Sequence, residues 1–371
     1  MREKSIENIK TLLVLSSDVK KTIIPYANEN LMFKNEKIKM MEVFKPNRII
    51  LKDITEDIDN SISTILHVNI SLTEGGTYNK DIPNTVTELV GNLNAIPADK
   101  IPPSIQKISF IGKKYNMHFG TILFKNLVHL KISLLNGGAI NLDNLPRSIE
   151  KLELVCYFDN NVKGEKLPNQ LKYLTFGLFF NSEWVNLPDT ITHLTFGNTY
   201  DKRCDIFPKS LTHLSFGKSF NQEIMLLAPG LIDLRFGEKF NHKICHILPP
   251  SLKRLDLGAK YDIDIQKLPD TLEILIIGTF ESKITVNIGN VPLIVNYHSN
   301  YSHTFRLLPT TIRFAILPQE STVLLRLKQP SSAIFYIVSK CSSVLGRLNN
   351  EQNSKPLEMK YVHRTNASCF F

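Results

Sequence analysis

The hydrophobic positions of this chain recur about every 20 to 22 residues through most of its length. Residues 167–187, LPNQLKYLTFGLFFNSEWVNL, show the repeating unit, and nearly the same pattern starts again at Leu187, Phe207, Leu248 and Leu268. A unit of this size cannot bury its apolar face alone, so successive units have to stack on one another. The pattern therefore predicts a solenoid.

Each unit begins at an anchor residue, usually a proline, and its apolar positions follow three, six and eight residues later. After Pro208 these positions hold Leu211, Leu214 and Phe216. The last two flank the polar Ser215, and such alternation is the period-two pattern of a half-buried strand. Because about 20 residues cannot also hold a long helix, we expect one short parallel strand in each coil. The return limb should be extended or briefly 3₁₀.

Other positions of the unit predict structural roles. Gly217, directly after the strand, is expected to let the backbone leave the strand with a positive φ. Phe220 and its equivalents Phe180 and Phe240 predict a stacked core spine, and Trp184 is expected in the core as well. The amides and carboxylates that follow the aromatic residue predict a ladder of side chains that bond backbone groups in the turn or in the next coil. They are Asp159, Asn181, Asp201, Asn221, Asn241 and Asp262.

The anchors give the extent of the solenoid. They fall at Pro83, Pro102, Phe124, Pro146, Pro168, Pro188, Pro208, Ala228, Pro249, Pro269, Pro292 and Pro309. A degenerate earlier coil is expected around residues 65–70. The sequence thus predicts about a dozen coils in a mostly β fold, with no gap long enough to be a linker.

The sequence SLTHLSFGKSFNQEI, residues 210–224, resembles the FNIP repeat, a relative of the leucine-rich repeat that occurs in social amoebae and in giant viruses of amoebae. Its paired steps recur at Phe176-Gly177/Phe180-Asn181, Phe196-Gly197/Tyr200-Asp201, Phe216-Gly217/Phe220-Asn221 and Phe236-Gly237/Phe240-Asn241. The likeness is strongest over residues 167–265 and extends over 83–309, although the coil at Pro292 lacks these pairs. The resemblance implies a leucine-rich-repeat-like solenoid that serves as an interaction platform, often coupled to an F-box. It implies no catalysis.

The flanks of the repeat differ from it in pattern. Residues 1–45 carry apolar residues at helical spacing, so we expect a helical N-terminal cap. A degenerate F-box-like segment and a disordered start are the alternatives. The solenoid then spans residues 46–318, and a C-terminal cap made of a strand or short helix spans 319–345. The polar residues 346–371 are expected to form a mobile tail.

The positions five and seven residues after each anchor are expected to lie on the concave face of the sheet, away from the core. The first column holds His129, Lys151, Tyr173, His193, His213, Asp233, Arg254 and Ile274, and the second holds Lys131, Glu153, Thr175, Thr195, Ser215, Arg235, Asp256 and Ile276. A solvated sheet face is the simplest interpretation. The alternative is a partner-binding face, since repeat proteins bind on such surfaces and Tyr and Arg are frequent at hot spots. Its candidate residues are Tyr173, His193, His213, Asp233, Arg235 and Arg254.

The net charge, the lengths of the apolar runs and the spacing of the cysteines limit which classes of function and location the protein can have. The formal net charge of +9 is modest, and the columns mix both signs, so we predict no nucleic-acid partner. No run of about 20 apolar residues predicts a membrane span, and the charged start MREKSIENIK is not a signal peptide. The five cysteines are scattered without CxxC spacing, which favours reduced thiols. These features predict an intracellular, cytoplasmic protein, in the host cytoplasm if it is viral.

Catalytic and cofactor motifs such as GxGxxG, HExxH and GxSxG are absent from the sequence. His193 and His213 have no carboxylate or thiol in register, so they make a poor metal site. We therefore predict no enzyme activity, no cofactor and no metal. Two functions stay open. One is a protein-interaction module that binds its partner on the concave sheet face and acts as an adaptor for ubiquitin-ligase components through residues 1–45. The other is a structural or regulatory scaffold with no dedicated partner.

Overall fold

The structure is a computed structural model that describes part of the chain. The described residues are 33–34, 48–51, 65–68, 78, 80–112, 124–134, 142, 145–155, 162–163, 167–261, 263, 268–276, 294–296, 314–317, 335–337 and 359–360. The chain divides into two compact units, unit 1 (Met1–Gly177) and unit 2 (Leu178–Phe371), each of which is described by itself.

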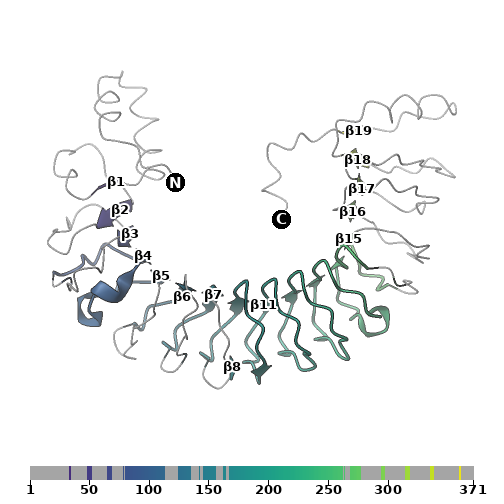
Figure 1. The fold of residues 1–371 in the computed structure, drawn as a ribbon, viewed down its shortest axis with the longest axis horizontal. Helices are drawn as coiled ribbons and strands as arrows, with labels where there is room; N and C mark the ends of the chain where they lie inside the picture. The colour runs from purple at the N-terminus through teal and green to yellow at the C-terminus, as the bar shows by residue number, and fades with distance from the viewer. Residues whose placement is uncertain are drawn as a thin grey trace. The chain divides into compact units, whose positions relative to one another are not determined.

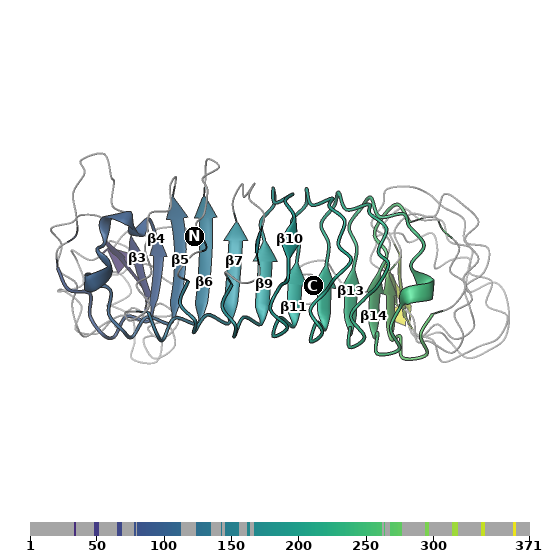
Figure 2. The same cartoon turned by 90° about the horizontal axis from the view of Figure 1, so that it is seen from below.

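Unit 1 is built on a parallel sheet with its strands in chain order. The strands are β1 (Phe33–Lys34), β2 (Arg48–Leu51), β3 (Ile65–Val68), β4 (Glu88–Gly91), β5 (Lys107–Gly112), β6 (His129–Leu134), β7 (Lys151–Val155) and β9 (Tyr173–Phe176). Figure 2 shows β5, β6, β7 and β9 side by side and pointing the same way. The remaining elements are β8 (Val162–Lys163) and the 3₁₀ turns η3 (Leu93–Ala95) and η4 (Ala98–Lys100).

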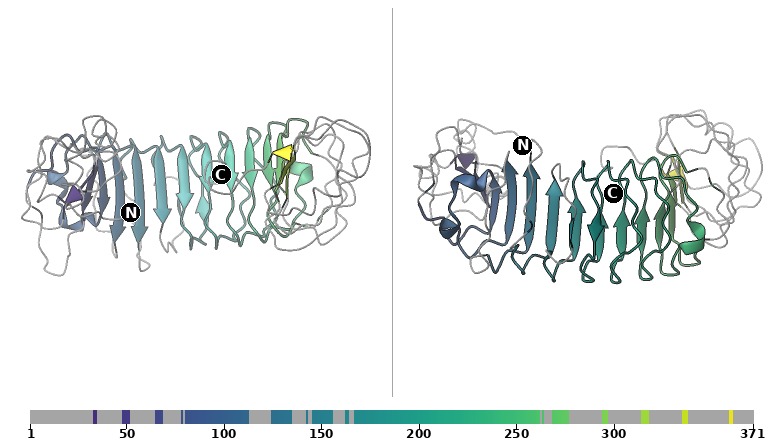
Figure 3. Two further views of the ribbon diagram at one scale, coloured as in Figure 1. Left: turned by 90° about the horizontal axis from the view of Figure 1, so that it is seen from above. Right: turned by 60° about the horizontal axis from the view of Figure 1, so that its bottom comes forward.

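Unit 2 continues with one short strand per coil. β11 (His193–Thr195), β12 (His213–Ser215), β13 (Asp233–Arg235), β14 (Arg254–Asp256) and β15 (Ile274–Ile276) pair in parallel. Another parallel sheet follows, made of β16 (Ile294–Asn296), β17 (Phe314–Leu317), β18 (Phe335–Ile337) and β19 (Met359–Lys360). The return limbs hold β10 (Trp184–Val185) and the 3₁₀ turn η6 (Cys245–Ile247). Strands and return limbs lie on opposite sides of the coils in unit 2 (Figures 1 and 3).

The prediction of a parallel solenoid with one strand per coil is confirmed. Short 3₁₀ turns are the helical elements among the described residues, in agreement with the expected extended or 3₁₀ return limbs. The strand β3 also bears out the expected early coil near residue 65.

The anchor residues explain how each coil enters its strand. The carbonyl oxygen of Pro208 accepts a hydrogen bond from the amide of Leu211 at 3.1 Å, which closes a tight turn before β12. The non-proline anchors Phe124 and Ala228 make the same bond to the amides three residues on, at 3.0 and 3.2 Å. The bond needs only a carbonyl, so an anchor does not have to be proline.

The core consists of the apolar positions that the repeat predicts. Leu211, Leu214, Phe216 and Ile224 are all buried. The aromatic spine is confirmed in unit 2, where Phe220 stacks between Tyr200 and Phe240 with centroid distances of 6.1 Å to each. Trp184 is only half-buried, but it packs on Phe196 and donates a hydrogen bond to the hydroxyl of Tyr200 at 2.9 Å.

Glycine is required after the strand for a different reason from the one that the sequence suggested. Positive φ occurs at Gly91 and Gly258 among the described glycines, and not at Gly217. A Cβ on Gly217 would overlap the carbonyl oxygen of Gly197 in the preceding coil. The position therefore requires glycine because two backbones approach closely there, and the expected positive φ at Gly217 is wrong.

Two side-chain ladders tie neighbouring coils together. The predicted amide ladder is confirmed: the amides of Asp201, Asn221 and Asn241 donate to the side chains of Asn181, Asp201 and Asn221 at 2.9, 2.8 and 2.9 Å. Asp159 and Asp262 lie outside the described residues.

The second ladder consists of hydroxyl groups two residues after the anchor, and it was not predicted. The Ser251 hydroxyl shares its one hydrogen between the carbonyl oxygens of Pro229 and Leu231, which lie 2.9 and 2.7 Å from Oγ. Thr271 makes the equivalent bonds to Pro250 and Leu252. The recurrence of Ser or Thr two residues after the anchor could have predicted this ladder from the sequence.

The ends of the chain stay largely untested. Within residues 1–45 the structure describes only β1, so the helical cap and the F-box-like alternative lie outside the described residues. β18 lies in the predicted C-terminal cap, and β19 is a strand within the predicted tail. The anchors Pro292 and Pro309 are not described either, so the count of about a dozen coils stays a prediction.

Candidate functional site

The sheet face, defined here as the two columns of strand residues that point away from the core, is the candidate site. In unit 1 the first column is Glu88, Lys107, His129, Lys151 and Tyr173, and the second is Val90, Ser109, Lys131, Glu153 and Thr175. In unit 2 the columns are His193, His213, Asp233, Arg254 and Ile274, and Thr195, Ser215, Arg235, Asp256 and Ile276. Within each unit the predicted register is confirmed.

Five of the six predicted partner-binding residues come together on unit 2. Arg235 donates two hydrogen bonds to the carboxylate of Asp233, from Nε at 2.9 Å and from Nη2 at 2.7 Å. Nε of Arg254, on the next strand, lies 3.8 Å from the same carboxylate. One carboxylate thus binds Arg235 through two hydrogen bonds and lies close to Arg254.

Asp233 is less exposed to solvent than a residue of a fully solvated sheet face would be. The residue is only 8% exposed because Arg235 and Arg254 lie against its carboxylate. Ile276, expected to point away from the core, is also buried. The column assignment therefore gives the register of these residues correctly but not their burial.

The two arginines differ in electrostatics. The hydrogen bonds that Arg235 donates to the carboxylate of Asp233 raise the pKa of Arg235. Burial, followed by the neighbouring charge of Arg235, lowers the pKa of Arg254. Nε of Arg254 is buried and has no hydrogen-bond acceptor among the described residues. Arg254 is consequently the less satisfied of the two cations.

His193 and His213 lie side by side on β11 and β12, and their rings stack with centroids 4.0 Å apart. Oγ1 of Thr212 donates its one hydrogen to the carbonyl of Thr192 at 3.0 Å. Nδ1 of His213, 2.9 Å from the same Oγ1, must then donate to it. This leaves Nε2 of His213 as the acceptor in the neutral ring. His213 is half-buried, not exposed as expected.

Tyr173 is the sixth predicted residue and belongs to unit 1. It opens β9, is 40% exposed, and lies in register with Lys151 of β7. Its place on the sheet face agrees with the prediction.

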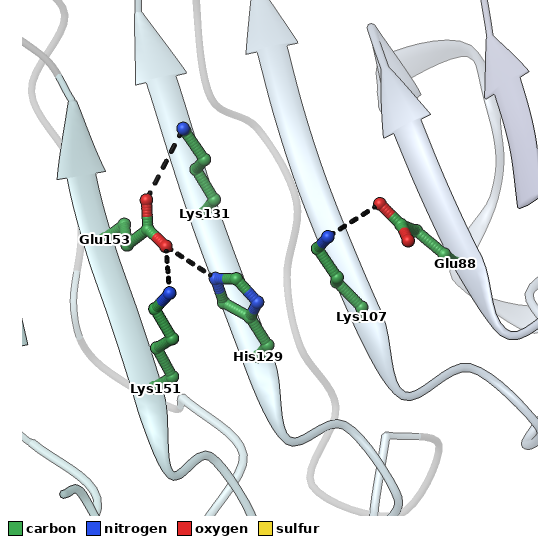
Figure 4. Close-up of polar contacts among 6 residues, drawn as sticks. All are labelled: Glu88, Lys107, His129, Lys131, Lys151 and Glu153. Atoms are coloured by element: carbon green, nitrogen blue, oxygen red, sulfur yellow. Dashed lines mark hydrogen bonds and ion pairs between the residues drawn. The ribbon is translucent and has the colours of Figure 1, made fainter. Parts of the chain in front are cut away.

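Unit 1 carries a charged cluster on the same face (Figure 4). Glu153 of β7 contacts Nζ of Lys151 at 2.8 Å, Nε2 of His129 at 2.9 Å and Nζ of Lys131 at 3.4 Å. Glu88 pairs separately with Lys107 at 3.0 Å. The sequence placed His129, Lys131, Lys151 and Glu153 in the columns, but it did not single them out as a cluster. The cluster could have been predicted from the opposite charges at adjacent positions of the columns, because such pairs interact across neighbouring strands.

Metal or membrane chemistry receives no support from the described parts of the chain. No group of three or more His, Cys, Asp or Glu side chains gathers there to hold a metal. Nowhere in those same residues does a helix combine the length and apolar character that a bilayer span requires.

Comparison with known proteins agrees with the repeat pattern. The model of the FNIP Repeat family matches residues 158–199, 180–219, 203–239 and 240–280. A comparison with curated proteins gave no match.

One of two similar solved structures supports the solenoid fold. One, described as CroV588, a novel circular LRR protein, is 22% identical with a TM-score of 0.59, over 90% of this chain and 59% of that chain. This chain therefore spans less than two thirds of that protein's length. YopM from Yersinia enterocolitica WA-314 is 16% identical with a TM-score of 0.43, over 86% of this chain and 82% of that chain. Residues 158–280 of this chain thus match FNIP repeats, and the fold is a leucine-rich-repeat-like solenoid.

Proposed function

We propose that this chain is a non-catalytic protein-interaction module and that a protein partner binds its sheet face. Leucine-rich-repeat-like solenoids are generally scaffolds for protein interaction, because their extended surfaces present side chains from many coils. The proposed contact residues are Tyr173 in unit 1 and His193, His213, Asp233, Arg235 and Arg254 in unit 2.

The arrangement around Asp233 carries this proposal. A partner that binds a free arginine must immobilise a long flexible side chain, which costs about 0.5 to 1.5 kcal/mol. Here Asp233 already holds Arg235 through two hydrogen bonds and lies beside Arg254. Arg235 is thus ordered before binding and Arg254 lies beside the same carboxylate. Arg is a residue type that often dominates binding energy.

The test is recovery of cellular partners by variants of the full chain. Tyr173→Ala combined with Arg254→Ala should reduce recovery of the main partner. Lys202→Ala combined with Lys239→Ala is the matched control, since both lysines are exposed outside the strands. Melting temperatures of all variants report on folding, and Tyr173→Ala alone serves if the double variant is unstable. Equal recovery by both pairs would remove the sheet face as the binding site and favour a scaffold with no dedicated partner.

A more specific form of the proposal is an adaptor for ubiquitin ligation. Its support is the helical spacing of Ile6, Ile9, Leu12 and Leu13 in the sequence and the F-box coupling that the family resemblance implies. Such a role requires an intracellular location. Affinity purification with residues 1–45 present or deleted tests it. Recovery of ubiquitin-ligase components that does not depend on this segment would count against the adaptor role.

A further inference from the structure

The charged cluster around Glu153 indicates which kind of partner can bind the sheet face of unit 1. Glu153 is the meeting point of Lys131 and Lys151, which come from neighbouring strands, with His129 beside them (Figure 4). The Glu153 side chain is only 16% exposed, whereas those of Lys131 and Lys151 are 40% and 43% exposed. The acid therefore lies low in the cluster and the two ammonium groups reach solvent above it.

The protonation states make this cluster positive. Burial raises the pKa of Glu153, but its hydrogen bond with Lys151 and the charges of Lys151, Lys131 and His129 outweigh burial and lower it to about 2. Burial lowers the pKa of His129 despite the nearby Glu153. At neutral pH, one carboxylate thus faces two ammonium groups and a neutral imidazole, so the cluster carries a net charge of +1.

The neighbouring strands do not cancel this charge. Glu88 and Lys107 neutralise each other at 3.0 Å. Thr175 and Tyr173, in register with Glu153 and Lys151 on β9, carry no charge at neutral pH. Each ammonium group has three donors, and Glu153 supplies only two oxygen atoms to share between both lysines and His129. Donors therefore remain for an incoming acid.

Tyr173 adds an apolar surface next to the cations. It lies in register with Lys151, on the neighbouring strand about 4.8 Å away. Lys131, Lys151 and Tyr173 thus occupy three successive strands, a span that an extended segment of a few residues can cover. Because Glu153 already holds the lysines in place, an acidic segment would meet ordered donors.

We propose that the sheet face of unit 1 binds an acidic, carboxylate-bearing segment of the protein partner through Lys131, Lys151 and Tyr173. The proposal rests on the protein-interaction function inferred above and adds the chemistry of the partner. A nucleic acid fits less well, because this contact offers only the two lysines Lys131 and Lys151, whereas nucleic-acid-binding faces cluster many Lys and Arg side chains.

The test uses the purified full chain and a short fluorescein-labelled peptide of alternating Glu and Ser. The expected result is binding that weakens as salt rises and that a Gln-Ser peptide does not reproduce. Lys131→Ala combined with Lys151→Ala should weaken binding about fivefold or more. Lys202→Ala combined with Lys239→Ala removes the same charge outside the strands and should leave the affinity unchanged. Lys151→Met alone serves if the double variant melts early.

Three outcomes would overturn the proposal. They are no binding of the acidic peptide, equal weakening by both lysine pairs, and tighter binding of a single-stranded oligonucleotide than of the peptide. The recovery experiment with Tyr173 and Arg254 variants is independent of this titration. If those variants lose the partner while the peptide does not bind, the interaction function stands and the acidic partner is wrong.

Discussion

The imidazole rings of His193 and His213 stack nearly parallel, with centroids 4.0 Å apart and an interplanar angle of 7°. Burial lowers the pKa of His193, and the electrostatic effect of His213 lowers it further. The negative charge of Asp233 raises it in part. The folded protein thus holds His193 in its neutral form at a pH where the unfolded chain would accept a proton.

This stack predicts a loss of stability in mild acid. Because the folded-state pKa of His193 is below its ordinary value of 6.5, the unfolded chain binds the proton first as pH falls. The melting temperature should therefore decline as pH drops from about 7 to about 5. His213→Phe keeps an aromatic ring in the stack and removes the neighbouring imidazole that helps to lower the pKa of His193, so its melting temperature should decline less steeply. The exposed His246→Gln is the control and should follow the wild-type slope. An unchanged slope in His213→Phe would show that the pair is not responsible.

Glu153 gives a second pH-dependent prediction, at lower pH. Its folded-state pKa of about 2 is below the ordinary value of 4.5. The stability it contributes is therefore fully present above about pH 4.5 and is lost as pH falls toward 2. Glu153→Gln should destabilise the protein by about 1 to 2 kcal/mol near neutral pH, because it removes the acceptor shared by two lysines. The difference from wild type should shrink by about pH 3.

Glu150→Gln is the matched control for Glu153. Glu150 forms an ion pair with Lys172 at 3.0 Å, and both side chains are exposed. Exposed pairs contribute about 0 to 1 kcal/mol, so this variant should melt close to wild type at every pH. Thermal melts of both variants at pH 7 and pH 3 make the comparison. Equal effects of the two substitutions would mean that Glu153 does not organise its neighbours.

The sequence was sufficient for the register of the sheet, because a repeat of fixed spacing places equivalent residues on adjacent strands. It therefore placed His193 beside His213 and Tyr173 beside Lys151 correctly. The burial of Asp233 could not be predicted in the same way, since it depends on where the long side chains of Arg235 and Arg254 turn. The cluster at Glu153 depends likewise on side-chain conformation, which spacing does not determine.

For the glycines after the strands, the sequence likewise predicted the position correctly but not the physical reason for it. The sequence predicted that glycine belongs there, but the reason lies between coils and not within one. An added Cβ on Gly237 would overlap the carbonyl oxygen of Gly217, whereas a Cβ on Gly230 meets nothing within 4 Å. Neither glycine is among the described residues with positive φ.

Alanine substitutions at these two glycines test that explanation. Gly237→Ala should destabilise the protein by about 1 to 3 kcal/mol, because the two backbones must move apart. Gly230→Ala should change stability by no more than about 1 kcal/mol, and in the stabilising direction, since alanine restricts the unfolded chain. Urea unfolding of both variants gives the comparison. A large loss in Gly230→Ala, or none in Gly237→Ala, would contradict the close approach of the coils.

The aromatic spine gives the largest expected effect on stability. Phe220 is fully buried, and its ring lies 3.9 Å from that of Phe216 and 6.1 Å from those of Tyr200 and Phe240. Phe220→Ala would leave a cavity between three successive coils and should cost about 3 to 5 kcal/mol. The coils on both sides would lose a stacking partner, so the substitution should weaken the interface between coils and not only one coil.

Two further variants rank the sites. Ile206 is 73% exposed, so Ile206→Ala should cost no more than about 0.5 kcal/mol although it also removes a large apolar side chain. His213→Ala should fall between the two, because it removes the ring that stacks on His193 from a half-buried position. Urea midpoints measured at pH 7.5, above the ordinary histidine pKa of 6.5 and hence above the lowered pKa of His193, separate packing from the titration of His193. If Ile206→Ala loses as much stability as Phe220→Ala, the spine does not hold the coils together, and the exposed side chain of Ile206 must be covered in solution.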